Sequence, residues 1–174
     1  MEFMEEINQK FRDLKKPNLN EISNALKQIS YISPYLIEPF IKAPEQFAYG
    51  RNVIYRNNAL EVILINLPPN TETAIHDHGK SIGCAIVLEG EMVNSIYRFN
   101  EDEVEKTASY HVTKGDCIYS APALIHKMSN FNEERMVSLH VYSPPLQDMV
   151  SYEECKTCLF PLLPLITFSK IEKS

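Results

Sequence analysis

The chain has no tryptophan, only five glycines and four cysteines, and no excess of basic residues. With 17 Lys and Arg against 23 Asp and Glu, its formal net charge is −6 and its pI is near 5.4. A chain of this charge has no positive surface field for nucleic acid or anionic lipid, so we expect neither as a partner. Its 174 residues and 44% hydrophobic content predict one globular domain that binds small molecules.

The chain also lacks any apolar run long enough to span a bilayer, and its first residues, Met1-Glu2-Phe3-Met4-Glu5-Glu6, show no basic segment followed by an apolar one. We therefore expect a cytoplasmic monomer without an obligate protein partner. The four cysteines are few and irregularly spaced, which indicates reduced thiols. They are Cys84, Cys117, Cys155 and Cys158. The last two form a C-x-x-C pair without a second pair or a thioredoxin-like strand and helix, so we assign it no metal or redox role.

Two regions follow one another along the chain. Residues 1–45 predict short helices, because apolar residues recur every three or four positions, as from Phe3 to Leu14. Asn20 is the expected cap of the second helix, and Ser33-Pro34 predicts the start of a brief third one. Residues 46–174 change to short β-rich segments separated by turns, which is typical of a barrel or a two-sheet sandwich. The expected strands are Val53–Tyr55, Leu60–Leu67, Thr73–His78, Ser81–Leu88, Met92–Phe99, Glu105–Thr113, Cys117–Ser120, His126–Asn130 and Met136–Tyr142.

Three histidines form the pattern that carries the most chemistry. His76 and His78 stand two apart in an expected strand, so both imidazoles can point to one side while Asp77 points to the other. His126 belongs to a second pattern, Gly-x6-Pro-x3-His-x3-Asn. Its other members are Gly115, Pro122 and Asn130. A single His-x-His pair is weak evidence, but three histidines in two such patterns predict a metal site.

An acidic ligand is missing from this predicted site. Where many related sites place a glutamate a few residues after the His-x-His pair, this chain carries Gly83. Iron(II) accepts imidazole well, and three neutral imidazoles leave the full positive charge on the metal. An anionic substrate donor such as a thiolate then enters with good charge balance. The absence of the carboxylate therefore favours a thiol substrate.

Together these patterns resemble the two split motifs of the cupin superfamily, which implies an all-β jelly-roll barrel with short N-terminal helices. More specifically, the chain from about Tyr49 to Phe168 resembles the cysteine dioxygenase type I family in its shorter bacterial form. The segments that carry this resemblance are Tyr49-Gly50-Arg51-Asn52, His76-Asp77-His78 with Ser81, Ile125-His126-Lys127 and Ser138-Leu139-His140-Val141-Tyr142-Ser143-Pro144-Pro145.

The resemblance implies an activity and its ligands. His76, His78 and His126 would bind one iron(II) per chain. L-Cysteine would bind the iron through its sulfur and its amine, and dioxygen would take the remaining position. Both oxygen atoms would be inserted into the sulfur, which gives cysteine sulfinic acid without a separate reductant. Because the chemistry belongs chiefly to the iron, the protein would contribute binding and orientation.

Arg51 is the residue that we expect to hold the substrate carboxylate, because a guanidinium grips a carboxylate through two hydrogen bonds. Tyr49 would assist it. By residue type alone, Arg51 is equally well a solvated arginine at a strand edge. The Tyr-x-Arg-Asn frame of the resemblance favours the functional role. It also bears on the substrate, since the related mercaptopropionate dioxygenases typically carry glutamine at this position.

His140 competes with His126 as the third ligand. A hairpin between residues 128–130 and 136–138 would place the two histidines opposite each other. The Pro-x3-His-x3-Asn frame selects His126 as the ligand and leaves His140 to orient catalytic groups. Tyr142 is two residues farther along the strand, so its hydroxyl would reach His140.

His140 and Tyr142 are therefore the expected catalytic residues. The resemblance implies that Tyr142 lies near the bound substrate and steers the oxygen chemistry, whereas its residue type alone also fits a core tyrosine. The resemblance further implies that Ser138 extends the hydrogen-bond chain to His140 and that the bond before Pro144 is cis. Without it, a cis bond would be improbable.

One position departs from the family pattern. Mammalian members link a cysteine covalently to the active-site tyrosine, and the matching residue in this chain is Gly83. Cys84 is adjacent, but strand alternation points it to the opposite face, so we expect Tyr142 to be unmodified. His111 matches no motif, and we expect it at the surface or at an end of the barrel.

The leading functional interpretation is an iron(II)-dependent thiol dioxygenase that acts on L-cysteine. The nearest alternative is a 3-mercaptopropionate dioxygenase. A third is a non-catalytic metal-binding cupin that senses or carries a ligand, which would need the histidines but not Arg51 or Tyr142. A zinc or manganese isomerase is disfavoured because such sites normally need the missing carboxylate.

Overall fold

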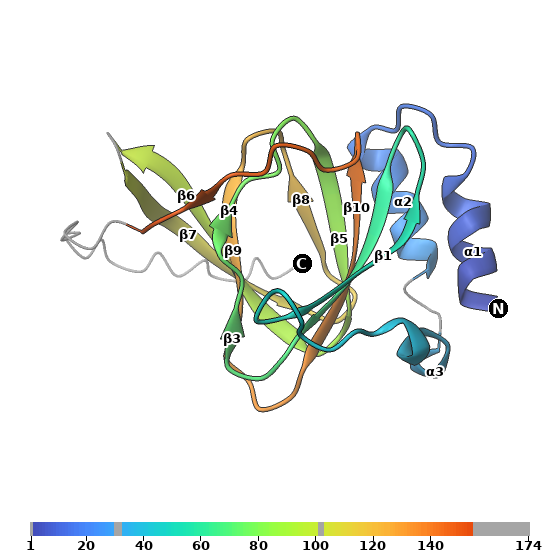
Figure 1. Ribbon diagram of the computed structural model, residues 1–174, viewed down its shortest axis with the longest axis horizontal. Helices are drawn as coiled ribbons and strands as arrows, with labels where there is room; N and C mark the ends of the chain where they lie inside the picture. The colour runs from blue at the N-terminus through green and yellow to red at the C-terminus, as the bar shows by residue number, and fades with distance from the viewer. Residues whose placement is uncertain (1, 30–32, 101–102, 155–174) are drawn as a thin grey trace, which may run out of the picture.

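Two antiparallel β-sheets face each other and enclose the interior of the molecule (Figure 1). In this computed structural model the described residues are 2–29, 33–100 and 103–154. The first sheet has the strand order β1-β2-β10-β5-β8 and the second the order β11-β4-β9-β6-β7, with β3 paired to β9. This arrangement confirms the expected all-β jelly-roll barrel. The strands are β1 (Gly50–Arg56), β2 (Glu61–Leu67), β3 (Thr71–Glu72), β4 (Ile75–His76), β5 (Ile82–Glu89), β6 (Glu91–Asn100), β7 (Glu103–Thr113), β8 (Cys117–Ser120), β9 (Ile125–Asn130), β10 (Met136–Ser143) and β11 (Ser151–Tyr152).

Short helices precede the barrel, as expected. They are α1 (Glu2–Phe11), α2 (Leu19–Ile29), α3 (Pro34–Ile37) and the 3-10 helix η1 (Glu38–Phe40). The side chain of Asn18 accepts hydrogen bonds from the amides of Asn20 and Glu21, and the Glu21 carboxylate accepts one from the amide of Asn18. This reciprocal pattern is a capping box. The expectation that Asn20 caps α2 is therefore wrong, because it is the side chain of Asn18 that reaches the free amides of the first turn.

The helices cover the outer face of the first sheet (Figure 1). Phe3, Ile7 and Leu26 are fully buried against residues on that face of the sheet, which are Val62, Leu64, Cys84, Ile86, Leu139 and Val141. The alternate residues of β2, Ile63 and Ile65, belong to a second cluster. Because β2 is buried on both faces, its sequence is almost continuously apolar. Each such buried side chain contributes about 1.5–3 kcal/mol to folding.

One expected strand, Thr73–His78, is wrong as a continuous element. The chain forms β3 and β4 with a break between them, and His78 lies beyond the end of β4. Asp77 explains this end: its carboxylate accepts hydrogen bonds from the amides of Gly79 and Val150 and so turns the chain out of the ladder. The short strand β11, which pairs with β4, was not expected from the sequence.

The expected hairpin between residues 128–130 and 136–138 is also wrong. Strand β9 lies in the second sheet and β10 in the first, so the chain crosses between the sheets here. The Asn130 side chain supports the crossing by donating hydrogen bonds to the carbonyl oxygens of Leu67 and Glu134. His126 and His140 therefore come from different sheets.

The remaining expected strands are present with small shifts at their ends. The division into a helical segment, residues 1–45, and a barrel, residues 46–174, in one domain stays a prediction. Cys155 and Cys158 lie outside the described residues. Within the described part of the chain, no helix is both long and apolar enough to span a membrane.

Candidate metal centre

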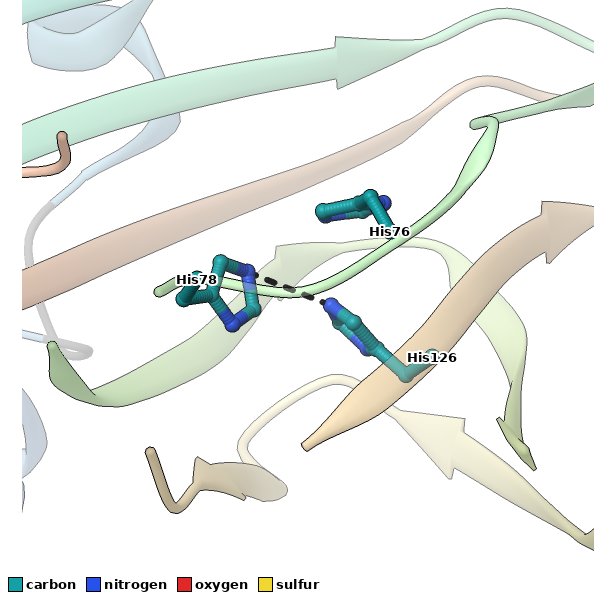
Figure 2. A group of neighbouring side chains, drawn as sticks. All are labelled: His76, His78 and His126. Carbon is teal, nitrogen blue, oxygen red and sulfur yellow. Dashed lines mark hydrogen bonds between the residues drawn. The ribbon is translucent and has the colours of Figure 1, made fainter. Parts of the chain in front are cut away.

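Three histidines from two neighbouring strand ends converge inside the barrel. His76 ends β4 and pairs in register with His126 of β9, and His78 follows two residues after His76. One ring nitrogen of each lies within 4.8 Å of the corresponding atoms of the other two. The ring centroids are 4.7–5.1 Å apart, and Figure 2 shows the three imidazoles turned toward a common centre. This is the spacing at which three imidazoles can share one metal ion.

Hydrogen bonds to the outer ring nitrogens orient two of these histidines. The Nδ1–H of His76 donates to the carbonyl oxygen of Ala74 at 2.8 Å, and that of His126 donates to Oδ1 of Asn94 at 2.8 Å. Both Nε2 atoms are thereby left as lone-pair donors. The Nε2 atoms of His126 and His78 are 3.3 Å apart. An acceptor behind each imidazole is the usual support of a histidine ligand, so the donor set fits a metal ion.

Burial keeps the three imidazoles neutral. Burial lowers the pKa of His76, and burial together with the neighbouring His76 lowers the pKa of His78 to about 3. The pKa of His126 is lowered well below its usual range, first by burial and then by the other histidines. Neutral imidazole is the form that binds metal, so at neutral pH the ligands need no deprotonation.

No carboxylate belongs to this cluster among the described residues. Asp77 lies between two of the histidines in sequence but points away, as expected, and accepts hydrogen bonds from the amide of Val150 and the hydroxyl of Tyr152. The sequence has Gly83 in place of a glutamate ligand, and this glycine lies opposite Tyr142 in the ladder between β5 and β10. The cluster can therefore offer a metal three neutral donors.

A hydrogen-bonded chain along β10 reaches this cluster. Ser138 Oγ lies 2.7 Å from His140 Nε2, and His140 Nδ1 lies 3.1 Å from the hydroxyl of Tyr142. That hydroxyl in turn lies 3.1 Å from Nε2 of His78. All of these side chains are buried. Because the three β10 residues alternate along one strand, they share its inner face.

The protonation states of this chain follow from burial. Burial lowers the pKa of His140 to about 3 and raises the pKa of Tyr142 above its usual range. The phenol therefore keeps its proton at neutral pH and is a hydrogen-bond donor. Its acceptor here is His78 Nε2 if His140 donates from Nδ1 and accepts from the Ser138 hydroxyl.

Arg51 of β1 and the neighbouring Tyr49 open into the same cavity as the histidines. The cavity has a volume of about 30 Å³. Its lining is Tyr49, Arg51, Ile63, Ile65, His76, His78, Met128, His140, Tyr142, Leu146 and Met149. None of the ion pairs formed by the described residues includes Arg51. Its charge is thus available to an anion in the cavity, and burial raises the pKa of Tyr49 beside it.

The family model for cysteine dioxygenase type I matches residues 39–155, which is more than half of the chain. The chain belongs to the cysteine dioxygenase type I family. From the sequence, the resemblance was expected to run from about Tyr49 to Phe168. The family match begins before Tyr49 and ends before Phe168.

Individual members of this family are distant relatives. Cysteine dioxygenase type 1 of Homo sapiens is 23% identical over 116 residues, covering 63% of this chain and 58% of the human protein. The Danio rerio protein is 25% identical over 145 residues, covering 79% of this chain and 71% of its own length. The match thus spans less than two thirds of the human protein.

Solved structures share the fold at low identity. A Klebsiella pneumoniae protein with a double-stranded β-helix domain superposes with a TM-score of 0.55 at 20% identity, covering 71% of this chain and 98% of that one. The Schizosaccharomyces pombe Cnp3 cupin domain has a TM-score of 0.51 at 8% identity, covering 61% and 70%. These similarities show the cupin fold alone.

Gly83 stands where the mammalian pattern has a cysteine, and the strand backbone at this glycine lies close to the Tyr142 ring. A Cβ atom at position 83 would lie 2.5 Å from Cδ1 of Tyr142. Cys84 faces the other way, into the cluster under the helices, which confirms the expectation from strand alternation. The bond between Ser143 and Pro144 is cis, as the family resemblance implied. His111 is exposed and pairs with Glu91 at 3.3 Å, as expected for a surface histidine.

Sequence reasoning missed two polar residues that support the centre, Asn94 and Glu61, and the supporting role of Asp77. Asn94 of β6 is 4% exposed and holds His126, and the only signal for it was a polar residue within a β-rich run. Glu61 accepts a hydrogen bond from the amide of Leu146 at 2.8 Å. Asp77 accepts one from the amide of Val150, so two carboxylates hold both ends of the segment that carries Leu146 and Met149 over the cavity.

Proposed function

We propose that this protein is an iron(II)-dependent thiol dioxygenase that converts L-cysteine and dioxygen to cysteine sulfinic acid. The observation that carries the proposal is a cluster of three neutral histidines without a carboxylate, two of which, His76 and His78, line a small cavity together with Arg51. Among the described residues, Arg51 forms no ion pair. Membership of the cysteine dioxygenase type I family supports it.

His76, His78 and His126 would hold the iron. When bound, iron(II) supplies Lewis acidity and the one-electron chemistry that lets dioxygen react with sulfur. Because all three donors are neutral, the residues leave the positive charge of the site uncompensated. A substrate thiol entering this site is favoured as the thiolate, which brings the missing negative charge.

Arg51 would orient the substrate through its carboxylate. A guanidinium can donate two parallel hydrogen bonds to a carboxylate, which fixes the direction of the molecule as well as its affinity. With the carboxylate at Arg51 and the sulfur at the histidines, the two ends of a small amino acid would span the cavity.

Tyr142 would act as the hydrogen-bond donor next to the substrate. Its hydroxyl donates to His78 Nε2 when that nitrogen keeps its lone pair. Tyr142 loses this acceptor when His78 binds a metal, and its proton is then free to hydrogen-bond a substrate atom. His140, held by Ser138, would keep the phenol in place from behind. The phenol stays protonated because burial raises the pKa of Tyr142.

The test is product analysis under air with the iron-loaded protein. L-Cysteine should give cysteine sulfinic acid with one dioxygen consumed per thiol. Faster turnover of 3-mercaptopropionate, which lacks the amine, would identify that thiol rather than L-cysteine as the preferred substrate. No oxygen consumption with any small thiol despite one bound iron per chain would favour the non-catalytic metal-binding protein instead.

The role of Arg51 is tested separately by Arg51→Ala. A hydrogen bond to a charged group is worth about 1.5–3 kcal/mol, so kcat/KM for L-cysteine should fall roughly 10- to 150-fold. Cysteamine, a thiol without a carboxylate, should be oxidised equally by the parent and the variant. Arg12→Ala is the matched control, because Arg12 is an exposed arginine that does not line the cavity. An equal loss for cysteamine would contradict the carboxylate role.

A further inference from the structure

Two free cysteines lie side by side on the outer face of the first sheet. Strands β5 and β8 are neighbours (Figure 1), with Cys84 opposite Tyr119 and Cys117 opposite Ile86. Cys84 and Cys117 are therefore diagonal neighbours on the same face of the ladder. Each thiol influences the acidity of the other, and the hydroxyl of Ser23 on α2 influences both.

The two thiols differ in their access to solvent. Cys84 is 2% exposed beneath the helices. Cys117 is half-buried and lines a cavity of about 460 Å³ between β8 and β7, which are edge strands of the two sheets. Cys117 is therefore the more accessible residue of the pair, whereas Cys84 is buried.

The surroundings also make the two thiols unequal in acidity. The neighbouring Cys84 thiol lowers the pKa of Cys117 to about 6, and the Ser23 hydroxyl and the Lys27 charge act in the same direction. Burial of Cys117 and the Asp116 carboxylate oppose this effect without cancelling it. The neighbouring Cys117 thiol, followed by burial, raises the pKa of Cys84. The accessible thiol is therefore the better nucleophile, because the thiolate is the reactive form.

We propose that Cys117 and Cys84 are a peroxide-sensitive thiol pair that closes reversibly to a disulfide. In the first step the Cys117 thiolate attacks one oxygen of hydrogen peroxide, the O–O bond breaks, and the departing hydroxide is protonated to water, which leaves a sulfenic acid on Cys117. In the second step the Cys84 sulfur, having lost its proton, attacks the Cys117 sulfur and displaces the hydroxyl group as a second water. The two thiols lose two electrons and hydrogen peroxide gains them.

The strand geometry makes this disulfide easy to reduce. Diagonal neighbours in an antiparallel pair have Cα atoms about 7–8 Å apart, whereas a relaxed disulfide spans about 4.4–6.8 Å. Closing the bond must therefore draw β8 toward β5. Gly83, next to Cys84, contacts the Tyr142 ring on the inner face, so the oxidised pair strains the strand that backs the metal centre.

The test treats the full chain, in the presence of a chelator, with hydrogen peroxide and then maps the peptides. The intact mass should fall by two hydrogens, and trypsin should release residues 81–98 joined to residues 115–127. Dithiothreitol should restore both. Before oxidation, iodoacetamide should modify Cys117 at least about tenfold faster than Cys84.

Three variants separate the roles. Cys117→Ser should leave Cys84 reduced, and Cys84→Ser should stop at a sulfenic acid on Cys117, seen as one added oxygen that dimedone traps. The double variant Cys155→Ser and Cys158→Ser is the control and should still form the joined peptides. A disulfide from Cys117 to Cys155 or Cys158 in the parent, or faster alkylation of Cys84, would overturn the proposal. These readouts do not depend on dioxygenase activity.

Discussion

Replacing Gly83 with alanine tests how closely Tyr142 is held against the strand next to it. The added Cβ would lie 2.5 Å from Cδ1 and 2.6 Å from Cε1 of the Tyr142 ring. Carbon atoms in contact prefer about 3.5–4.0 Å, so the overlap is roughly an ångström for two ring atoms at once. Tyr142 is only 6% exposed, so the ring cannot move aside without disturbing its neighbours.

The expected cost follows from these contacts. Overpacking of this kind costs about 1–3 kcal/mol. If the ring moves, the Tyr142 hydroxyl loses hydrogen bonds to His140 and His78, each worth about 0.5–1.5 kcal/mol. Alanine recovers about 0.5–1 kcal/mol in the strand, because glycine is more flexible in the unfolded chain. We expect Gly83→Ala to lower the free energy of unfolding by about 1–5 kcal/mol, with each kcal/mol lowering Tm by about 2–4 °C.

The assay is thermal and urea unfolding followed by circular dichroism, combined with a double-mutant cycle. In a Tyr142→Phe background the ring remains, so Gly83→Ala should still destabilise. In a Tyr142→Ala background the overlap is gone, and the same change should be neutral or slightly stabilising. If Gly83→Ala costs as much without the ring as with it, the steric explanation is refuted and the cause lies in the strand backbone.

Three further results are expected. Asn94→Ala removes the acceptor behind His126, so metal affinity should fall roughly 10- to 100-fold in competition with a chelator, and an unchanged affinity would show that Asn94 does not support the ligand. His140 has a lowered pKa of about 3, so only the unfolded chain takes up its proton as pH falls below about 6.5. Urea unfolding of the metal-free protein should therefore show about 2 kcal/mol of stability lost between about pH 6.5 and 5 from this group, and His140→Asn should reduce the slope. Intact mass and mapping of the peptide with Tyr142 should show an unmodified tyrosine, whereas a thioether to Cys84 would contradict this.

Much of the centre could be predicted because its residues stand in local patterns. The spacing of His76 and His78 needs only strand alternation, and that of Ser138, His140 and Tyr142 needs the same rule on a longer strand. Even though the chain leaves the strand after β4, both histidines still reach the centre. Their roles as ligands remain proposals that the geometry supports.

The parts that were missed depend on contacts between distant segments. Asn94 matters only because β6 lies beside β9, and nothing near it in sequence announces that neighbour. The hairpin prediction failed because a short turn normally joins paired strands, whereas Asn130 and the pairing of β10 with β2 direct this chain into the other sheet. Strand β11 has two residues, too few to show a period.

The link between Asp77 and Tyr152 has a consequence for the order of folding. It joins residues 75 positions apart, and Asp77 stands between two of the candidate ligands. The contact of His126 with His78 spans 48 positions. Contacts of such long range form late, since their loop entropy is lost before they are made. The three histidines come together only once β4 has paired with β9, so metal uptake during refolding would report this long-range pairing rather than an early local collapse.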